Sequence, residues 1–187
     1  MFWPFNRFSS KSRSGSGRTI DSIYGMIVAR AREPRFYQQY GVPDTVDGRF
    51  DLLLLHLWMV LRRLGPQGLD SPMSQALFDC FCSDMDANLR EMGIGDLTVP
   101  KRMQKFGEAF YGRSTAYDAA LEKGRDALAQ AICKNVLNGT ASAQAARLAA
   151  YTEAVLADLA AFDEQAFRSG AWRFAPLAAL AEPASGD

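Results

Sequence analysis

Few side chains in this sequence have the types and spacing that catalysis or metal binding requires. The chain has 187 residues and one histidine, His56, so metal sites built on two or three histidines are excluded. His56 stands within the apolar run LLLLHLWMVL (residues 52–61), where we interpret it as a buried core histidine rather than a catalyst. The alternative is a helical haem- or small-molecule-binding protein that uses His56, with a methionine as the second haem ligand.

The cysteines and the neighbouring acidic residues do not form a metal site either. Cys80 and Cys82 stand on a predicted helix, where a spacing of two residues separates them by about 200° around the axis. Asp84 and Asp86 have the same spacing, so neither pair can bind one metal ion together. The third cysteine, Cys133, belongs to no CxxC motif, and three unpaired thiols indicate a reducing compartment. We therefore expect no metal, no cofactor and no enzymatic activity.

The segment LREMGIGDLTVPK (residues 89–101) contains a Gly-x-Gly pattern of the kind seen in phosphate-binding loops. It lacks the third glycine, the preceding strand and the Lys-Ser/Thr pair of nucleotide-binding motifs. A corner between two helices explains it better: Gly93 ends one helix, Gly95 permits a tight turn and Pro100 begins the next helix. Its surplus of charged residues suits either an internal ion-pair clasp or a docking surface.

Hydrophobic periodicity predicts helices throughout, and no segment alternates as a strand does. The segment 46–64 is apolar around almost its whole circumference, so we expect a central helix that other helices surround. Asp44 or Asp47 is expected to cap it, rather than to bind a cation with Asp51. Its apolar run is about half of the roughly 20 residues needed to span a bilayer. The predicted fold is all-α, a compact domain of six to eight helices.

The other helix boundaries follow from capping signals. Thr19 is expected to cap the first helix, and Ser71 with Pro72 to start a helix over about 72–92. The helix that Pro100 begins is expected to end near residue 113, with Ser114 or Thr115 capping the next one. A break at Gly139 should precede an alanine-rich helix over about 141–162. A methionine stripe is explained by core packing, with a contribution to a binding surface as the alternative: Met73, Met85, Met92 and Met103.

Composition and charge narrow the class of partner. Hydrophobic residues make up 48% of the chain, and 21 basic residues balance 21 acidic ones, which argues against nucleic acid as a partner. We predict a flexible tail over residues 1–18, a helical domain over 19–175 and a C-terminal tail over 176–187. The first tail is basic and aromatic, so the alternative hypothesis for it is membrane contact through six of its residues: Phe2, Trp3, Phe5, Arg7, Phe8 and Lys11.

Several unusual strings occur in order within about residues 20–136: GVPDTVDGRFD, LFDCFCSDMDANLREMG, GDLTVPK and EAFYGR. With these strings the sequence resembles the ubiquinol–cytochrome c chaperone family of cytochrome bc1 assembly factors. The family has mitochondrial members and alphaproteobacterial relatives, and the resemblance favours the latter. It implies a non-enzymatic helical chaperone that binds newly made cytochrome b, and a cytoplasmic location peripheral to the inner membrane. A small helical partner and a ribosome contact are also implied by family analogy.

The charged residues of the segment that matches the family are predicted to contact the client or a partner. The hypothesis rests on the surplus charge around the helix corner and on the nearby aromatic and basic positions of the next helix. The predicted contact residues are Asp84, Asp86, Arg90, Glu91, Asp96, Lys101, Arg102, Tyr111 and Arg113.

Overall fold

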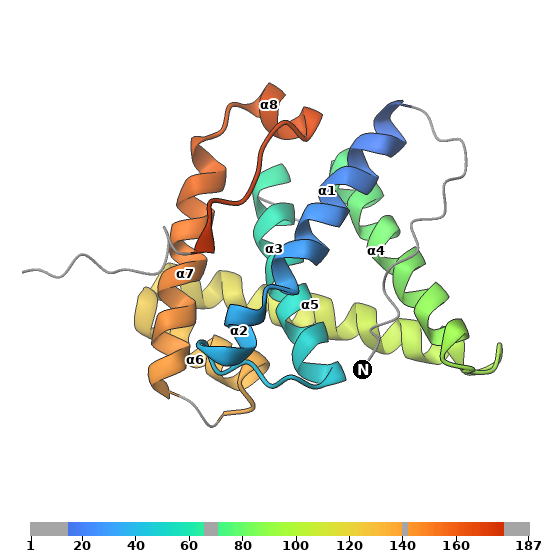
Figure 1. Cartoon of the computed structure of the whole chain (residues 1–187), viewed down its shortest axis with the longest axis horizontal. Coiled ribbons are helices and arrows are strands. Elements are labelled where there is room, and N and C mark those ends of the chain that lie inside the picture. Colours follow the sequence, from blue (N-terminus) through green and yellow to red (C-terminus); the bar gives the residue numbers. More distant parts are fainter. Residues whose placement is uncertain (1–14, 66–70, 140–141, 178–187) are drawn as a thin grey trace, which may run out of the picture.

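The computed structural model describes residues 15–65, 71–139 and 142–177 (Figure 1). These residues form eight helices and no strand, so the predicted all-α fold is confirmed. The helices are α1 (Gly15–Ala31), α2 (Pro34–Gln38), α3 (Val46–Leu64), α4 (Pro72–Glu91), α5 (Val99–Lys123), α6 (Arg125–Val136), α7 (Ser142–Ala161) and α8 (Glu164–Ser169).

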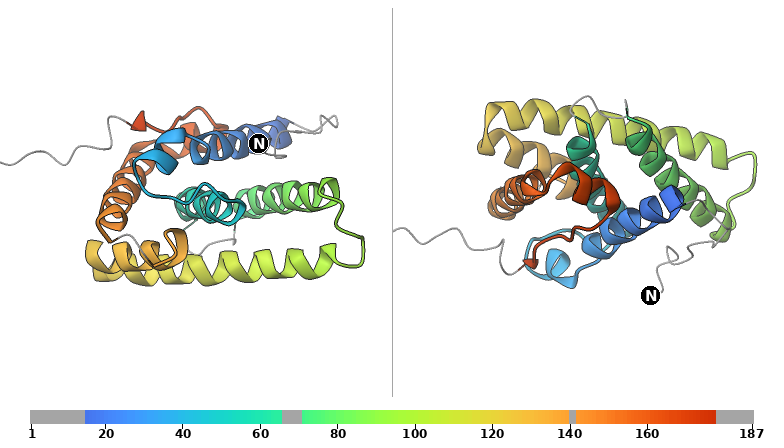
Figure 2. Two further views of the ribbon diagram at one scale, coloured as in Figure 1. Left: turned by 60° about the horizontal axis from the view of Figure 1, so that its bottom comes forward. Right: turned by 90° about the horizontal axis from the view of Figure 1, so that it is seen from above.

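The helices lie in layers around α3 (Figure 2). α1 and α2 lie on one side, α5 and α6 lie on the other, and α3 and α4 lie between them; α7 closes one end. α3 contacts α1, α4, α5, α6 and α7, and every residue from Asp51 to Leu61 is buried. The prediction of a central helix over 46–64 is therefore confirmed. A helix that is apolar on all sides can bury its whole circumference only when other helices surround it.

The start of α3 corrects one capping prediction. The Thr45 hydroxyl accepts a hydrogen bond from the Gly48 N–H at 3.1 Å, so Thr45 is the N-cap, and neither Asp44 nor Asp47 is. Asp44 instead pairs with Arg49. Gly48 packs so closely on the loop that an added Cβ would lie 2.2 Å from the Pro43 carbonyl oxygen, so the loop and the helix start are locked together.

Two other helix boundaries differ from the prediction. α1 begins at Gly15, so Thr19 lies inside the helix and is not its cap. α5 runs without a break from Val99 to Lys123, so neither Ser114 nor Thr115 starts a helix. Burial of Phe110, Tyr117 and Ala120 continues the apolar stripe of α5 past its two internal glycines, and this packing outweighs their cost of about 1 kcal/mol each. The helix ends at Gly124, whose φ is +100°.

Residues 142–177 pack on the rest of the described domain. α7 contacts α3 and α6, and after α8 the chain continues over the core with Trp172 and Leu177 buried. The buried Arg30 side chain of α1 donates a hydrogen bond to the Ala175 carbonyl, which ties this segment to α1. Ser71 and Pro72 begin α4 as expected, and Gly139 has a φ of +76° at the break before α7.

Candidate functional site

The corner between α4 and α5 is a short turn with a defined hydrogen-bond pattern. Gly93 has a φ of +78°, its N–H donates to the Arg90 carbonyl at 2.9 Å, and the Ile94 N–H donates to the Leu89 carbonyl at 3.0 Å. The Thr98 N–H donates to the Gly95 carbonyl at 2.8 Å. The first two bonds satisfy the Arg90 and Leu89 carbonyls at the end of α4, and the third closes the turn before α5.

Three of the predicted contact residues form two ion pairs at this corner, both made by Arg90. The Arg90 guanidinium donates to the Asp86 carboxylate at 2.6 Å on the same helix, and also pairs with Asp96 in the turn. Because all three side chains are substantially exposed, this clasp orients the turn more than it stabilises the fold. The ion-pair clasp considered from the sequence is therefore present.

Two other predicted contact residues, Asp84 and Arg113, form hydrogen bonds with residues of other helices. The Asp84 carboxylate accepts a hydrogen bond from the Tyr24 hydroxyl at 2.8 Å, at the contact between α1 and α4. Burial raises the pKa of Asp84 above its ordinary value. Arg113 on α5 donates to Asp51 on α3 at 2.6 Å. Both side chains therefore join helices of the core.

The remaining predicted residues are exposed, in two places. Glu91, Lys101 and Arg102 lie at the corner itself. Tyr111 is 53% exposed, and its ring packs against that of Phe78 with centroids 5.8 Å apart. It lies about 15 Å along α5 from the corner, at 1.5 Å per residue. The predicted membrane-contact residues, Phe2, Trp3, Phe5, Arg7, Phe8 and Lys11, lie outside the described part of the chain.

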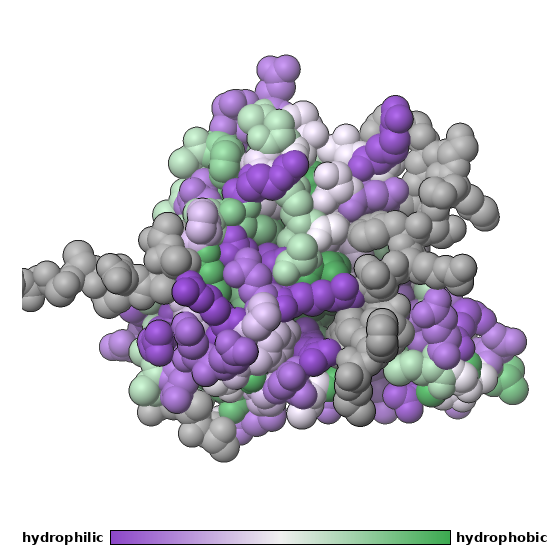
Figure 3. Space-filling model, viewed as in Figure 1, coloured by the Kyte–Doolittle hydropathy of each residue, from purple (hydrophilic) through white to green (hydrophobic). Residues whose placement is uncertain are grey.

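The corner also presents two apolar side chains to solvent. Leu97 is 91% exposed and Met92 is 51% exposed. Figure 3 shows this hydrophobic surface at lower right, among hydrophilic side chains. Leu97 was not predicted as a contact residue. Its place in the sequence could have indicated exposure, because it lies in a turn of glycine and polar residues, outside the apolar face of any predicted helix. Within the methionine stripe, Met85 is buried and Met73 and Met103 are partly buried.

His56 is a core residue, as expected. It is fully buried, with Nδ1 2.8 Å from the Leu52 carbonyl oxygen and Nε2 2.7 Å from the Tyr151 hydroxyl. Because a carbonyl only accepts, Nδ1 donates and Nε2 accepts from Tyr151. Burial lowers the pKa of His56 to about 3, so the ring is neutral. A haem iron would have to displace the Tyr151 hydroxyl from inside the core.

Residues 15–65, 71–139 and 142–177 contain no group of three or more His, Cys, Asp or Glu side chains placed to hold a metal ion. Within the same ranges, none of the helices has the length and apolar character needed to cross a bilayer.

A family model and three related proteins match most of the described domain. The family model described as ubiquinol-cytochrome C chaperone matches residues 38–174. Ubiquinol-cytochrome-c reductase complex assembly factor 1 of Xenopus laevis is 28% identical over 117 residues, and the Mus musculus and Homo sapiens proteins are each 26% identical over 117 residues. These alignments cover 62% of this chain, and 58%, 40% and 39% of the three relatives, so the chain spans less than two thirds of their length.

A solved structure supports the same relationship. The crystal structure of the Cbp3 homolog from Brucella abortus has a TM-score of 0.76 to this fold at 37% identity, covering 87% of this chain and 91% of that one. The family match runs from the end of α2 past α8, and it includes α3 and the whole α4–α5 corner. This chain therefore belongs to the ubiquinol-cytochrome c chaperone family.

Proposed function

We propose that this protein is a non-enzymatic chaperone in the assembly of ubiquinol-cytochrome c reductase and that it binds newly made cytochrome b. The names of the family and of the three assembly-factor relatives support the assembly role. Cytochrome b is the client that the family resemblance implies. In this proposal the protein works at the cytoplasmic face of the inner membrane, in peripheral contact with it.

The observation that carries the proposal is the apolar tip of the α4–α5 corner. Leu97 is 91% exposed on a turn that hydrogen bonds hold in place, within the segment that matches the family. Burying one leucine side chain against a client would contribute about 2 kcal/mol. Met92, which is also exposed at this corner, has a flexible and polarisable side chain, which suits the varied apolar surfaces of a membrane protein before assembly.

The charged residues of the corner would give the contact its orientation. Arg90, Asp86 and Asp96 hold the turn, while Glu91, Lys101 and Arg102 remain exposed beside the apolar tip. Exposed charges around an apolar centre contribute more to orientation and partner selection than to affinity. Asp84 and Arg113 would act indirectly in this arrangement, by positioning α4 and α5.

Photocross-linking in cells of the source organism tests the proposal. A benzophenone amino acid replaces Leu97, and a matched variant carries it at Val46, which is 62% exposed at the start of α3. We expect a covalent adduct with cytochrome b from position 97 and much less from position 46. Equal labelling from both positions, or adducts at position 97 that never contain cytochrome b, would refute this surface.

A further inference from the structure

A groove of about 450 Å³ runs between the second half of α5 and α6. The chain reverses direction at Gly124, so the two helices lie side by side in one outer layer of the fold (Figure 2). The first residue that lines the groove is about 20 Å along α5 from its start at the corner, at 1.5 Å per residue. Small residues form its floor: Gly112, Ala116, Ala119, Ala120, Ala127 and Ala131.

The shape of the groove fits a helix. No floor side chain is larger than a methyl group, so a third helix could approach α5 and α6 as closely as packed helices do, with axes about 8–10 Å apart. Ala119 is exposed, and Ala116 and Ala127 are partly exposed, so no helix of the described domain covers this floor. A bilayer surface is flat and would leave the floor of a groove without contact.

The charges that line the groove are positive. Lys123 and Lys134 both line it, and no acidic residue does. Glu122 and Asp126 are close to Lys123 in the sequence but do not line the groove. Within the ranges that the structure describes, neither lysine forms an ion pair. An acidic side chain of a bound helix would therefore meet lysines that have no partner to give up.

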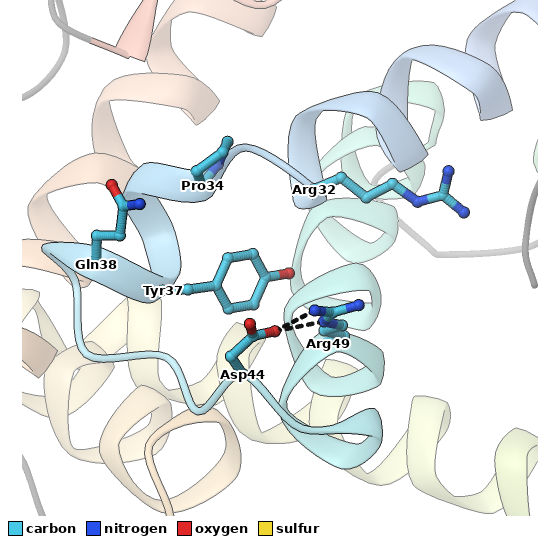
Figure 4. Close-up of a pocket in the computed structure, with 6 residues that line it drawn as sticks. All are labelled: Arg32, Pro34, Tyr37, Gln38, Asp44 and Arg49. Carbon is cyan, nitrogen blue, oxygen red and sulfur yellow. Dashed lines mark hydrogen bonds and ion pairs between the residues drawn. The ribbon is translucent and has the colours of Figure 1, made fainter. Parts of the chain in front are cut away.

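Another hollow, of about 300 Å³, lies between α2 and the start of α3 (Figure 4). Arg49 there already donates to Asp44, with Nε 2.6 Å from Oδ1, and the Arg32 side chain points away from this pair. The arginine that faces this hollow is thus already bound to a carboxylate of the same chain. The lysines of the α5–α6 groove are not, so that groove is better suited to an acidic partner.

The spacing of the two lysines defines the pattern that a partner helix would need. Eleven residues separate Lys123 from Lys134, which is about 16 Å along the axis of α6 at 1.5 Å per residue. Eleven residues of a second helix span the same length and return to nearly the same face, about 20° away. Two acidic side chains with that spacing could therefore meet both lysines at once.

We propose that this groove binds an amphipathic helix of a partner polypeptide that carries two acidic side chains eleven residues apart and small residues between them. The acidic side chains pair with Lys123 and Lys134, and the small residues pack on the alanine floor. A partner bound there leaves the α4–α5 corner free. The inference does not depend on cytochrome b being the client.

The first test is a titration of the full-length ¹⁵N-labelled protein, followed by NMR. The probe is an acetylated and amidated helical peptide of alanine and glutamine with two glutamates eleven residues apart. One comparison peptide has its glutamates nine residues apart, on opposite faces, and another has glutamine in place of both. We expect saturable shifts of the Ala119 and Ala131 amide signals with the probe. Binding should be about fivefold weaker with the nine-residue spacing and about twentyfold weaker without glutamate.

Variants in the groove and matched controls outside it locate the site. Lys134→Gln should weaken binding of the probe about fivefold, whereas Lys105→Gln changes an exposed lysine of α5 outside the groove and should leave binding unchanged. Ala119→Trp fills the groove and should weaken binding by at least about tenfold. Ala146→Trp places the same ring at an exposed alanine of α7 and should have no effect.

The outcomes decide between occupants. Weaker binding in Lys134→Gln and Ala119→Trp with both controls unchanged supports the proposal, and if Ala119→Trp fails to fold, Lys134→Gln and the three peptides decide. Absence of saturable shifts, or equal affinity for the eleven- and nine-residue spacings, overturns it. Shifts of these signals on raising the protein concentration alone, without peptide binding, would identify a second copy as the occupant. Their loss with phosphatidylglycerol vesicles, again without peptide binding, would identify a lipid surface, and either result overturns the proposal.

Discussion

The carboxylate of Asp51 accepts a hydrogen bond from Arg113 at 2.6 Å, and this contact joins the central helix α3 to α5. Asp51 is only 6% exposed. Burial raises its pKa to about 6, although the charge of Arg113 acts to lower it. The cost of removing the carboxylate from water is therefore larger than the attraction of its arginine partner.

The free energy of unfolding should depend on pH because the pKa of Asp51 differs between the folded and unfolded states. Its folded pKa of about 6 lies above the ordinary value of about 3.9, so the unfolded state loses this proton first as the pH rises. Asp51 therefore stabilises the fold fully below about pH 4, and this contribution is lost by about pH 6. Relative to Asp51→Asn, the wild-type free energy of unfolding should fall by about 2–3 kcal/mol between about pH 4 and pH 7.

Urea unfolding of both proteins across this range measures the effect. His56 acts in the opposite direction: its pKa is lowered to about 3, so its contribution is present above about pH 6.5 and is lost as the pH falls. Because both proteins keep His56, its contribution cancels in the difference. Parallel stability curves for the two proteins would contradict the raised pKa of Asp51.

The hydrogen bond between Tyr151 and His56 should be worth about 1–3 kcal/mol. Tyr151→Phe removes the hydroxyl that donates to Nε2 and leaves a fully buried acceptor without this partner. We expect the free energy of unfolding to fall by that amount in a denaturant titration. The matched variant Tyr111→Phe removes a hydroxyl from an exposed tyrosine, and we expect it to change stability by less than about 0.5 kcal/mol.

A haem role for His56 has a separate spectral test. Because Nε2 accepts from Tyr151 inside the core, we expect haemin to give no Soret shift that depends on His56. Spectra of wild type and His56→Ala with equimolar haemin make the comparison. A Soret band that appears in wild type and disappears in the variant would restore the haem-binding alternative.

Two glycines with equally open surroundings should respond oppositely to alanine. Neither Gly93 nor Gly112 has an atom within 4 Å of an added Cβ. Gly112 lies inside α5, where alanine should stabilise the protein by about 0.5–1 kcal/mol. Gly93 has a φ of +78°, where alanine should destabilise it by about 1 kcal/mol. Thermal unfolding measures both, and a stabilising Gly93→Ala would contradict the left-handed turn.

Charge reversal at the corner should impair assembly without unfolding the domain. Lys101 is exposed at the start of α5, and Lys123 is exposed at its end, so Lys101→Glu and Lys123→Glu form a matched pair. If the corner contacts the client, Lys101→Glu should lower ubiquinol–cytochrome c reductase activity and spectral cytochrome b in membranes. Lys123→Glu should lower neither. Normal assembly with Lys101→Glu and Arg90→Glu would refute the role of these charges.

Local sequence predicted the elements whose signals lie within one helix turn. The bounds of α3 follow from a continuous apolar pattern, and Ser71 with Pro72 marks the start of α4 because cap and first turn are adjacent in the chain. The predicted cap of α3, Asp44 or Asp47, was wrong, because the threonine between these two residues can also cap a helix. Thr45 is the cap, while Asp44 is bound to Arg49, and that choice depends on side-chain partners rather than on propensity.

Hydrophobic periodicity and glycine stereochemistry act over short distances along the chain, so they predict the all-α class, the central helix and the position of the corner without any knowledge of the fold. Which charged residues face inward depends instead on contacts between distant parts of the chain. Asp84 meets Tyr24 from 60 residues away and Arg113 meets Asp51 from 62 residues away, and no local pattern encodes either pairing. Leu97 remains exposed for the complementary reason: its turn projects beyond the packed faces of α4 and α5, so no helix of the described domain covers it.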